Sequence, residues 1–190
     1  KMPTNAMAPL GISRTFQNLQ VFKNMTVVEN VMVGRHIRTK TGTLRAALKL
    51  PGTKKEEVSA YDKAMEYIQF VGLQDLYDHL AGNLALGKLR LLELARALAT
   101  EPKLLLLDEI AAGLNHKETK EMSNLIEKIR NNGTTVFVVE HDMDLVMSIC
   151  DKIIVLDQGE KIAEGTPREI QSNQRVITAY LGAEVEKNAQ

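Results

Sequence analysis

The sequence has little that would tie it to an oxidising compartment, a membrane or a polyanion. Its single cysteine, Cys150, excludes an internal disulfide and suits a reducing cytosol. Lys+Arg and Asp+Glu both number 24, so the formal net charge is +0 and no basic field indicates nucleic acid. No apolar run reaches the roughly 18–20 residues of a membrane span, and the first residues lack a signal-peptide core. We therefore expect a soluble, cytoplasmic protein with no direct membrane insertion and no nucleic-acid partner.

What the sequence does contain is a globular composition with two successive patterns. Its 190 residues are 44% hydrophobic and 25% charged, which suits one domain with a real core, or a core plus a small subdomain. Between about residues 26 and 100 the apolar spacing is almost entirely helical. Beyond residue 100, short apolar runs alternate with helical spacing, which is typical of a mainly parallel sheet. We therefore expect an α/β fold with a helical subdomain.

Individual elements can be placed by their local signals. Thr26 and Glu29 predict a capping box that starts a helix over residues 26–37. A helix over 56–73 is expected to bury one face, and another is expected over 89–102. The apolar face of the helix over 56–73 is predicted to consist of Val58, Tyr61, Met65, Ile68 and Val71. Two interpretations stay open: this face is the subdomain's own core, or its Val58, Tyr61 and Met65 part is a surface beside the permease. Strands are predicted over 11–17, 103–109 and 134–142 and as a hairpin over 152–165, with helices over 117–132, 143–151, 166–173 and 175–182.

Two adjacent carboxylates, Asp108 and Glu109, end the apolar run that begins at Leu104. In a parallel sheet, ligands bind beyond the carboxyl ends of the strands. There the aspartate can hold a magnesium ion through water and the glutamate can polarise an attacking water. The alternative is that either acid caps the following helix or pairs with a surface lysine. The two residues alone do not decide between these readings.

Four segments then follow one another in an informative order. RTFQ (14–17) precedes the helical stretch, and NLALGKLRLLELARAL (83–98) stands just before LLLLDE (104–109). AGLN (112–115) follows at once, and VVEHD (138–142) comes later. This order resembles the nucleotide-binding subunits of ABC transporters, whose fold is a P-loop-NTPase-like parallel sheet. Residues 11–36, 140–170 and 176–182 are most similar to the subunits that power branched-chain amino-acid importers.

The resemblance implies roles for three residues around the two acids. Gln17 matches the Q-loop glutamine, which senses magnesium and γ-phosphate and faces the membrane permease. Asp108 matches the Walker B aspartate that holds the metal, and Glu109 matches the catalytic glutamate. His141 matches the switch histidine, although a lone histidine is more often structural. The cofactors implied by the family are ATP and magnesium.

Two further segments match nucleotide-contacting parts of the family. Residues 84–88 occupy the signature-motif position, where Gly87 is expected to leave N–H groups free at a helix start. Asn115 falls in the D-loop. The signature departs from the family pattern, because Ala85 has no hydroxyl for a γ-phosphate and Lys88 replaces an amide or acid. Ile110 stands where a proline normally follows the Asp-Glu pair.

The family's phosphate-binding loop is absent from the printed sequence. No G-x-x-x-x-G-K-[ST] occurs, and only ten residues precede Gly11. That loop supplies the backbone N–H groups and the lysine that hold the phosphates. We therefore expect a chain truncated at its N-terminus that hydrolyses ATP no faster than background on its own.

Two function classes stay open. The first is the ATP-binding subunit of an ABC importer for branched-chain amino acids, with membrane permease partners and a peripheral place at the inner face of the membrane. The second is a non-hydrolysing scaffold, engineered or degenerate, derived from such a subunit, and a homodimer is possible for either. The expected organisation is a Q-loop strand (1–25), a helical subdomain (26–100) that faces the permease, an α/β core (101–166) and C-terminal helices (167–190).

The missing loop also leads to a prediction about the sheet. In the family, the strand that enters the loop lies between the strand of Asp108 and the strand that ends near His141. An unpaired strand edge is an aggregation hazard. We expect residues 103–108 and 134–140 to pair directly, connected by the helix between them in a right-handed crossover. The alternative is that a second copy of the chain, or an added segment, supplies the missing strand.

Overall fold

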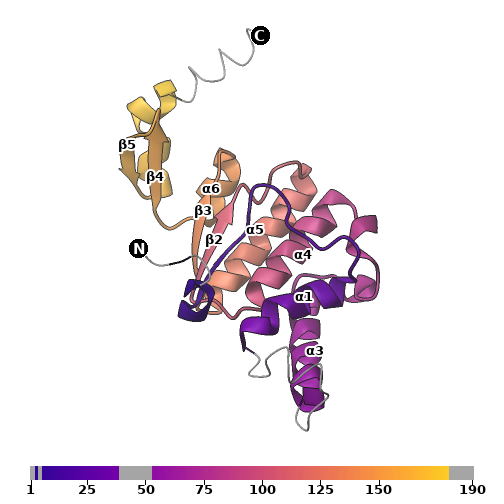
Figure 1. The fold of residues 1–190 in the computed structure, drawn as a ribbon. Coiled ribbons are helices and arrows are strands. Elements are labelled where there is room, and N and C mark those ends of the chain that lie inside the picture. The colour runs from indigo at the N-terminus through magenta and orange to yellow at the C-terminus, as the bar shows by residue number, and fades with distance from the viewer. Residues whose placement is uncertain (1–2, 4–5, 39–52, 180–190) are drawn as a thin grey trace. The chain divides into compact units, whose positions relative to one another are not determined.

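A computed structural model describes residue 3, residues 6–38 and residues 53–179 of the chain (Figure 1). The chain divides into two compact units, Lys1–Glu140 and His141–Gln190. The helices of residues 26–100 belong to the same unit as the three-stranded sheet. The division into four segments stays a prediction. Residues 39–52 and the end of the helix predicted over 175–182 lie outside the described residues.

The sheet of the first unit is parallel and has the order β1-β2-β3. Its strands are β1 (Ile12–Arg14), β2 (Leu104–Asp108) and β3 (Thr135–Val139). The helix α5 (His116–Asn131) connects β2 to β3, and Leu104 pairs with Thr135 in the register. The direct pairing of these two strands was predicted from the sequence and is confirmed. Two parallel neighbouring strands need such a crossover, because the chain must return to the starting end of the sheet before the second strand begins.

Three helices of the first unit form a packed group. They are α1 (Val27–Arg35), α3 (Thr53–Phe70) and α4 (Leu86–Leu98), and each packs against the other two. The capping box at Thr26 is confirmed, since Glu29 N–H donates to its hydroxyl and Thr26 N–H donates to the Glu29 carboxylate at 2.7 Å. Short 3-10 turns lie at Ala8–Leu10, His36–Arg38, Gln74–Leu76 and Ala81–Asn83.

The face that α3 buries differs from the predicted one. Val58 is 53% exposed and Tyr61 is 39% exposed, whereas Ala60 and Ala64 are buried together with Ile68. Residues four apart line one stripe of a helix, so 60, 64 and 68 form the contact stripe. Alanine has no side chain beyond Cβ and lets neighbouring helices approach closely. Of the predicted apolar face, Ile68 and Val71 are buried, and the interpretation of Val58 and Tyr61 as core is wrong. The alternative, that Val58 and Tyr61 form a surface beside the permease, stays a prediction.

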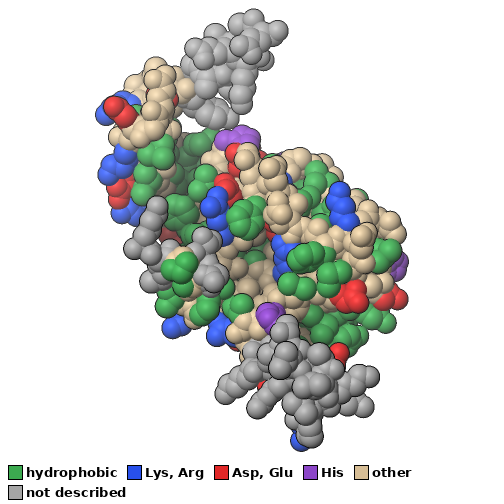
Figure 2. Space-filling model, viewed as in Figure 1, with side chains coloured by type: hydrophobic (Ala, Val, Ile, Leu, Met, Phe, Trp, Pro, Cys, Tyr) green, Lys and Arg blue, Asp and Glu red, His purple; other side chains and the backbone are tan. Residues whose placement is uncertain are grey.

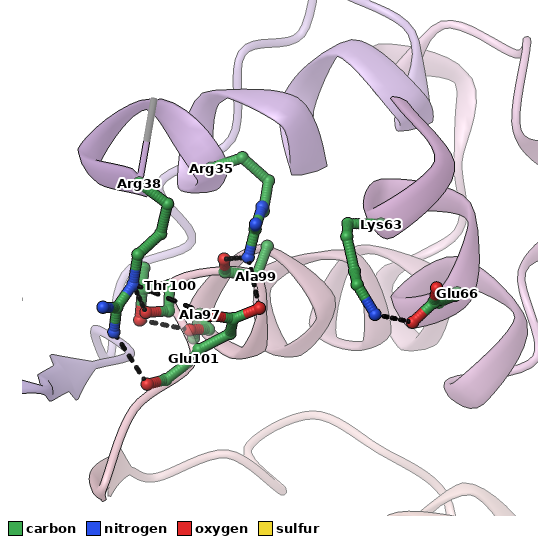
Figure 3. Close-up of polar contacts among 8 residues, drawn as sticks. All are labelled: Arg35, Arg38, Lys63, Glu66, Ala97, Ala99, Thr100 and Glu101. Atoms are coloured by element: carbon green, nitrogen blue, oxygen red, sulfur yellow. Dashed lines mark hydrogen bonds and ion pairs between the residues drawn. The ribbon is translucent and has the colours of Figure 1, made fainter. Parts of the chain in front are cut away.

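The C-terminal end of α4 is fixed to α1 by charged side chains (Figure 3). Arg35 donates to Ala99 O at 3.3 Å and to Glu101 Oε1 at 2.6 Å. Arg38 donates to the carbonyls of Thr100 and Glu101 at 2.9 and 3.0 Å. Cations satisfy the free carbonyls at a helix C-terminus and favour its dipole. This end of α4 is therefore anchored independently of its N-terminal end.

The second unit contains α6 (Met143–Ile149), an antiparallel hairpin and α7 (Pro167–Gln171). The hairpin consists of β4 (Ile153–Asp157) and β5 (Glu160–Gly165), as predicted, and turns through the two residues between them. The core of this unit is formed by Ile153, Ile170 and Val176. Residues 174–179 are helical. In the described part of the chain, no helix is long and apolar enough to span a membrane.

The surface shows no segregation of charge on the face seen in Figure 2. Lysine and arginine side chains are interspersed there with aspartate and glutamate. This distribution agrees with the equal numbers of cationic and anionic residues in the sequence.

Candidate functional site

Two residues predicted for the site meet at the carboxyl end of β2. Gln17 Nε2 donates a hydrogen bond to Glu109 Oε2 at 2.8 Å, although 92 positions separate them in the sequence. Glu109 has a φ of 48°, and its own N–H donates to Val139 O at 2.9 Å. A non-glycine residue at positive φ costs free energy and clusters at functional sites. The turn after β2 therefore aims the Glu109 carboxylate towards the segment that follows β1.

Asp108 lies beside this pair and has a partner that the sequence did not indicate. Arg14 Nη2 donates to Asp108 Oδ2 at 2.7 Å, with the two side chains 55% and 26% exposed. The backbone N–H of Asp108 donates to Thr15 Oγ1 at 3.3 Å. Arg14 is the last residue of β1 and also lies over the Phe16 ring. The pairing of β1 with β2 brings Arg14 to Asp108, and sequence reasoning, which did not predict that pairing, missed it.

The donors at this end of β2 are compatible with a magnesium ion that keeps other ligands. In residues 6–38 and 53–179, no three or more His, Cys, Asp or Glu side chains are grouped to hold a metal. Magnesium commonly uses one or two carboxylates and takes its remaining ligands from water and phosphate oxygens. Asp108 supplies such a carboxylate, and the Gln17 amide oxygen remains available because its Nε2 makes the bond to Glu109. The residues therefore suit a metal bound together with phosphate, and do not form an all-protein site.

Asn115 caps the helix α5. Its side-chain Oδ1 accepts from the Glu118 N–H at 3.0 Å, and its own N–H donates to Glu118 Oε2 at 3.0 Å. This is a complete capping box, and the N-x-x-E spacing of the sequence could have indicated it. The structure gives Asn115 a local role, and its predicted contact with nucleotide stays a prediction.

Gly87 lies against the same glutamate. A Cβ built on Gly87 would lie 2.4 Å from Glu118 Oε1, so the carboxylate touches the first turn of α4. The helix begins at Leu86, three residues before the predicted start, and Ala85 provides no side-chain cap. Leu86 in turn lies against Gly113, where a built Cβ would be 2.7 Å from Leu86 Cδ2. The segments predicted as signature motif and D-loop are therefore in contact within one chain.

The second strand end near the site is occupied by Glu140. Its Oε1 accepts from the Ala111 N–H at 2.9 Å, which fixes the turn that follows Glu109. His141 is the first residue of the second unit, and its predicted switch-histidine role stays a prediction. Sequence reasoning noted the segment 138–142 but gave Glu140 no role.

Comparison with known families now identifies the group. A family model described as ABC transporter matches residues 3–112. The chain belongs to the ABC transporter family. A second model, described as branched-chain amino acid ATP-binding cassette transporter, matches residues 160–186. The resemblance found in the sequence motifs is thereby confirmed for both ends of the chain.

Curated relatives of this ABC chain agree. It is 46% identical over 182 residues to the high-affinity branched-chain amino acid transport ATP-binding protein LivG of Escherichia coli strain K12, covering 95% of this chain and 71% of the relative. It is 45% identical to BraF of Pseudomonas aeruginosa, a protein of the same description, again covering 95% of this chain and 71% of the relative. The recognised group, ATP-binding subunits of the branched-chain amino-acid type, is therefore confirmed.

Solved structures confirm the ABC ATPase fold. A crystal structure of an ATP-binding cassette in its ADP conformation is 33% identical with a TM-score of 0.76, covering 93% of this chain and 70% of that one. A nucleotide-free ATP-binding cassette is 32% identical with a TM-score of 0.74, covering 92% and 70%. The α/β prediction with a parallel sheet and helices is correct.

Proposed function

We propose that this chain is the ATP-binding subunit of an ABC importer for branched-chain amino acids and couples ATP hydrolysis to transport in the assembled transporter. The observation that carries the proposal is the Gln17–Glu109 hydrogen bond beside Asp108, at the ligand-binding edge of a parallel sheet. LivG and BraF are branched-chain amino acid transport ATP-binding proteins, which supports the choice of substrate. The partners are the membrane permease subunits, which hold the chain peripherally at the inner face of the membrane.

Each site residue has a distinct task in this proposal. Asp108 and the Gln17 amide oxygen would hold a magnesium ion, which would supply positive charge to the phosphates. Glu109 would polarise a water, with its carboxylate oriented by the Gln17 amide nitrogen. Gly87 and Asn115 are the candidate nucleotide contacts of the signature and D-loop segments, and His141 keeps the switch-histidine role that the family resemblance implies.

A second function is favoured by one specific observation. The printed sequence contains no G-x-x-x-x-G-K-[ST], so none of these 190 residues provides the usual phosphate cradle. A chain with the cassette fold and no phosphate cradle would act as a non-hydrolysing scaffold. The two functions differ in whether magnesium and ATP bind.

The deciding experiment measures ATP binding and hydrolysis by the full chain, alone and reconstituted with a branched-chain permease. We expect background hydrolysis for these 190 residues by themselves, and leucine-dependent hydrolysis for a complex in which the subunit also carries a phosphate-binding loop. Glu109→Gln should lower that rate of hydrolysis about 100-fold or more, because it removes the carboxylate that polarises water. Glu121→Gln, at an exposed position of α5, is the matched control. Absence of any ATP binding in the complex would reject the importer function and leave the scaffold.

A further inference from the structure

Two charged side chains of α4 are buried next to the segment that leads into Gln17. Arg90 and Glu93 have side chains only 5% and 2% exposed, and Arg90 Nη1 lies 3.6 Å from Glu93 Oε2. Charged residues are almost never this buried unless they are paired. Their position one turn apart on α4 aims both towards the backbone after β1.

Glu93 binds the backbone of Phe16, and Arg90 binds the backbone of Phe16 and of Gln17. Glu93 Oε1 accepts from the Phe16 N–H at 3.3 Å. Arg90 donates from Nη1 to Phe16 O at 3.4 Å and from Nη2 to Gln17 O at 3.1 Å. The strand β1 has already ended at Arg14, so no sheet ladder places these two residues. Three backbone groups of the segment are therefore fixed by α4.

This arrangement is expensive for the fold. Burial raises the pKa of the Glu93 carboxyl, opposed by the Phe16 hydrogen bond and the charge of Arg90. Among the residues that the structure describes, Arg90 Nε and Glu93 Oε2 find no hydrogen-bond partner. A well-packed apolar pair of similar volume is often as stable as a buried ion pair, or more stable. Stability alone therefore does not account for the two charges at these positions.

We propose that Arg90 and Glu93 are positioning residues that hold the backbone of Gln17 so that its amide reaches Glu109, and that they connect this contact rigidly to α4. The catalytic consequence rests on the proposed function, whereas the positioning itself does not. Gly87 lies three residues before Arg90, about 4.5 Å along the helix axis at 1.5 Å per residue. When the N-terminal end of α4 moves, Arg90 and Glu93 therefore move the backbone of Phe16 and Gln17 with it in the same chain.

The positioning is tested by hydrogen exchange and NMR on the full chain. In Glu93→Ala, the Phe16 amide should exchange about 10-fold to 100-fold faster, the range expected for losing a hydrogen bond to a charged group. In Glu93→Ala and Arg90→Ala, the side-chain amide signals of Gln17 should move towards those seen in Glu109→Ala. Should the alanine variants fail to fold, Arg90→Lys keeps the charge, loses the forked geometry and is expected to show the same changes more weakly.

A matched control separates positioning from general loss of stability. Leu92→Ala truncates a fully buried apolar side chain of the same helix. It should lower stability and leave the Phe16 amide and the Gln17 signals in place. The proposal is overturned if Leu92→Ala at equal stability loss has the same local effect, or if the Glu93 and Arg90 variants leave both signals unchanged.

A kinetic arm examines the catalytic consequence in the reconstituted transporter. Glu93→Ala should lower kcat at an unchanged ATP dissociation constant, and should have little further effect when Gln17→Ala is already present. Additive effects of the two substitutions would reject coupling through Gln17. If the unaltered complex shows no turnover while the exchange result holds, the positioning stands and the proposed function fails.

Discussion

A pair of glycine-to-alanine substitutions tests how tightly the helices of the first unit are packed. A Cβ built on Gly34 would lie 2.3 Å from the backbone oxygen of Arg96 and 3.2 Å from Ala99 Cβ. A Cβ built on Gly87 would lie 2.4 Å from Glu118 Oε1. The two clashes are nearly equal in distance, but one obstacle is helix backbone and the other is the end of a flexible side chain.

The nature of the obstacle decides the expected magnitude. For Gly34→Ala, α1 must withdraw from α4 by about 1 Å to restore a contact of roughly 3.5 Å. Such overpacking costs about 1–3 kcal/mol or more, against a gain of about 1 kcal/mol in helix propensity. Because the obstacle is backbone and cannot rotate away, the upper part of this range, about 2–3 kcal/mol, applies, and we expect a net loss of about 1–2 kcal/mol in the free energy of unfolding. For Gly87→Ala, the Glu118 side chain can rotate away, which loses its capping contact at a cost of about 1 kcal/mol. The gain of about 1 kcal/mol in helix propensity offsets this cost, so the net change in the free energy of unfolding should be near zero.

Urea unfolding followed by far-UV circular dichroism measures both variants. Val33→Ala, at an exposed position beside Gly34, is the control for substitution in α1 and should be close to neutral. The reasoning is refuted if Gly34→Ala is as stable as the unaltered protein, or if Gly87→Ala is the more destabilising of the two. A Gly87→Ala variant that is stable yet loses nucleotide-dependent function would indicate that Gly87 is needed for close approach of a ligand.

Three other outcomes are expected. Asn115→Ala should lower the free energy of unfolding by about 1 kcal/mol through loss of the α5 cap, and Asn115→Ser should retain most of it; equal values in urea unfolding would contradict the capping role. Val58→Ser should change stability by less than about 0.5 kcal/mol, whereas Ile68→Ala should cost about 2–5 kcal/mol; thermal unfolding of both variants decides which face of α3 is buried. Hydrogen bonds from Lys152 and Lys161 lower the pKa of Glu164 to about 2, so its stabilising contribution is complete above pH 4.5 and is lost as the pH falls towards 2. A carboxyl NMR titration of Glu164 would contradict this if that group titrated near its ordinary value of 4.5.

The parts predicted correctly from the sequence are those specified by neighbouring residues. The capping box at Thr26 needs only its own hydroxyl and Glu29 three positions on. The hairpin turn needs only Gln158 and Gly159, both at positive φ. The place of Asp108 and Glu109 at the end of β2 needed only the apolar run that precedes them, whereas their contact with a ligand stays a prediction. Local signals of this kind survive in the fold because tertiary contacts do not have to create them.

The parts that were missed depend on partners far along the chain. Arg14 meets Asp108 across 94 positions, and Glu93 meets Phe16 across 77. Which face of α3 is buried depends on how closely α1 and α4 pack against it. The spacing of apolar residues along α3 carries no information on the distance between these helices. Side-chain partners of this type become visible only when the strand register and helix packing are known.

The strand register accounts for the meeting of Gln17 and Glu109 more directly than either residue does. Arg14 is opposite Leu106 in the parallel pair β1–β2, and Gln17 and Glu109 each lie three residues beyond that pair. Equal offsets after paired positions of parallel strands bring the two chain segments out of the sheet side by side. A slip of one residue would turn Arg14 away from Asp108 and carry Gln17 past Glu109, because alternate side chains face opposite sides of a sheet. The bonds from Thr15 N–H to Leu106 O and from Asp108 N–H to Thr15 Oγ1 oppose such a slip at the point where the strands end. Thr15, which is only 1% exposed, therefore contributes to the site by fixing its register, with no contact to a ligand required.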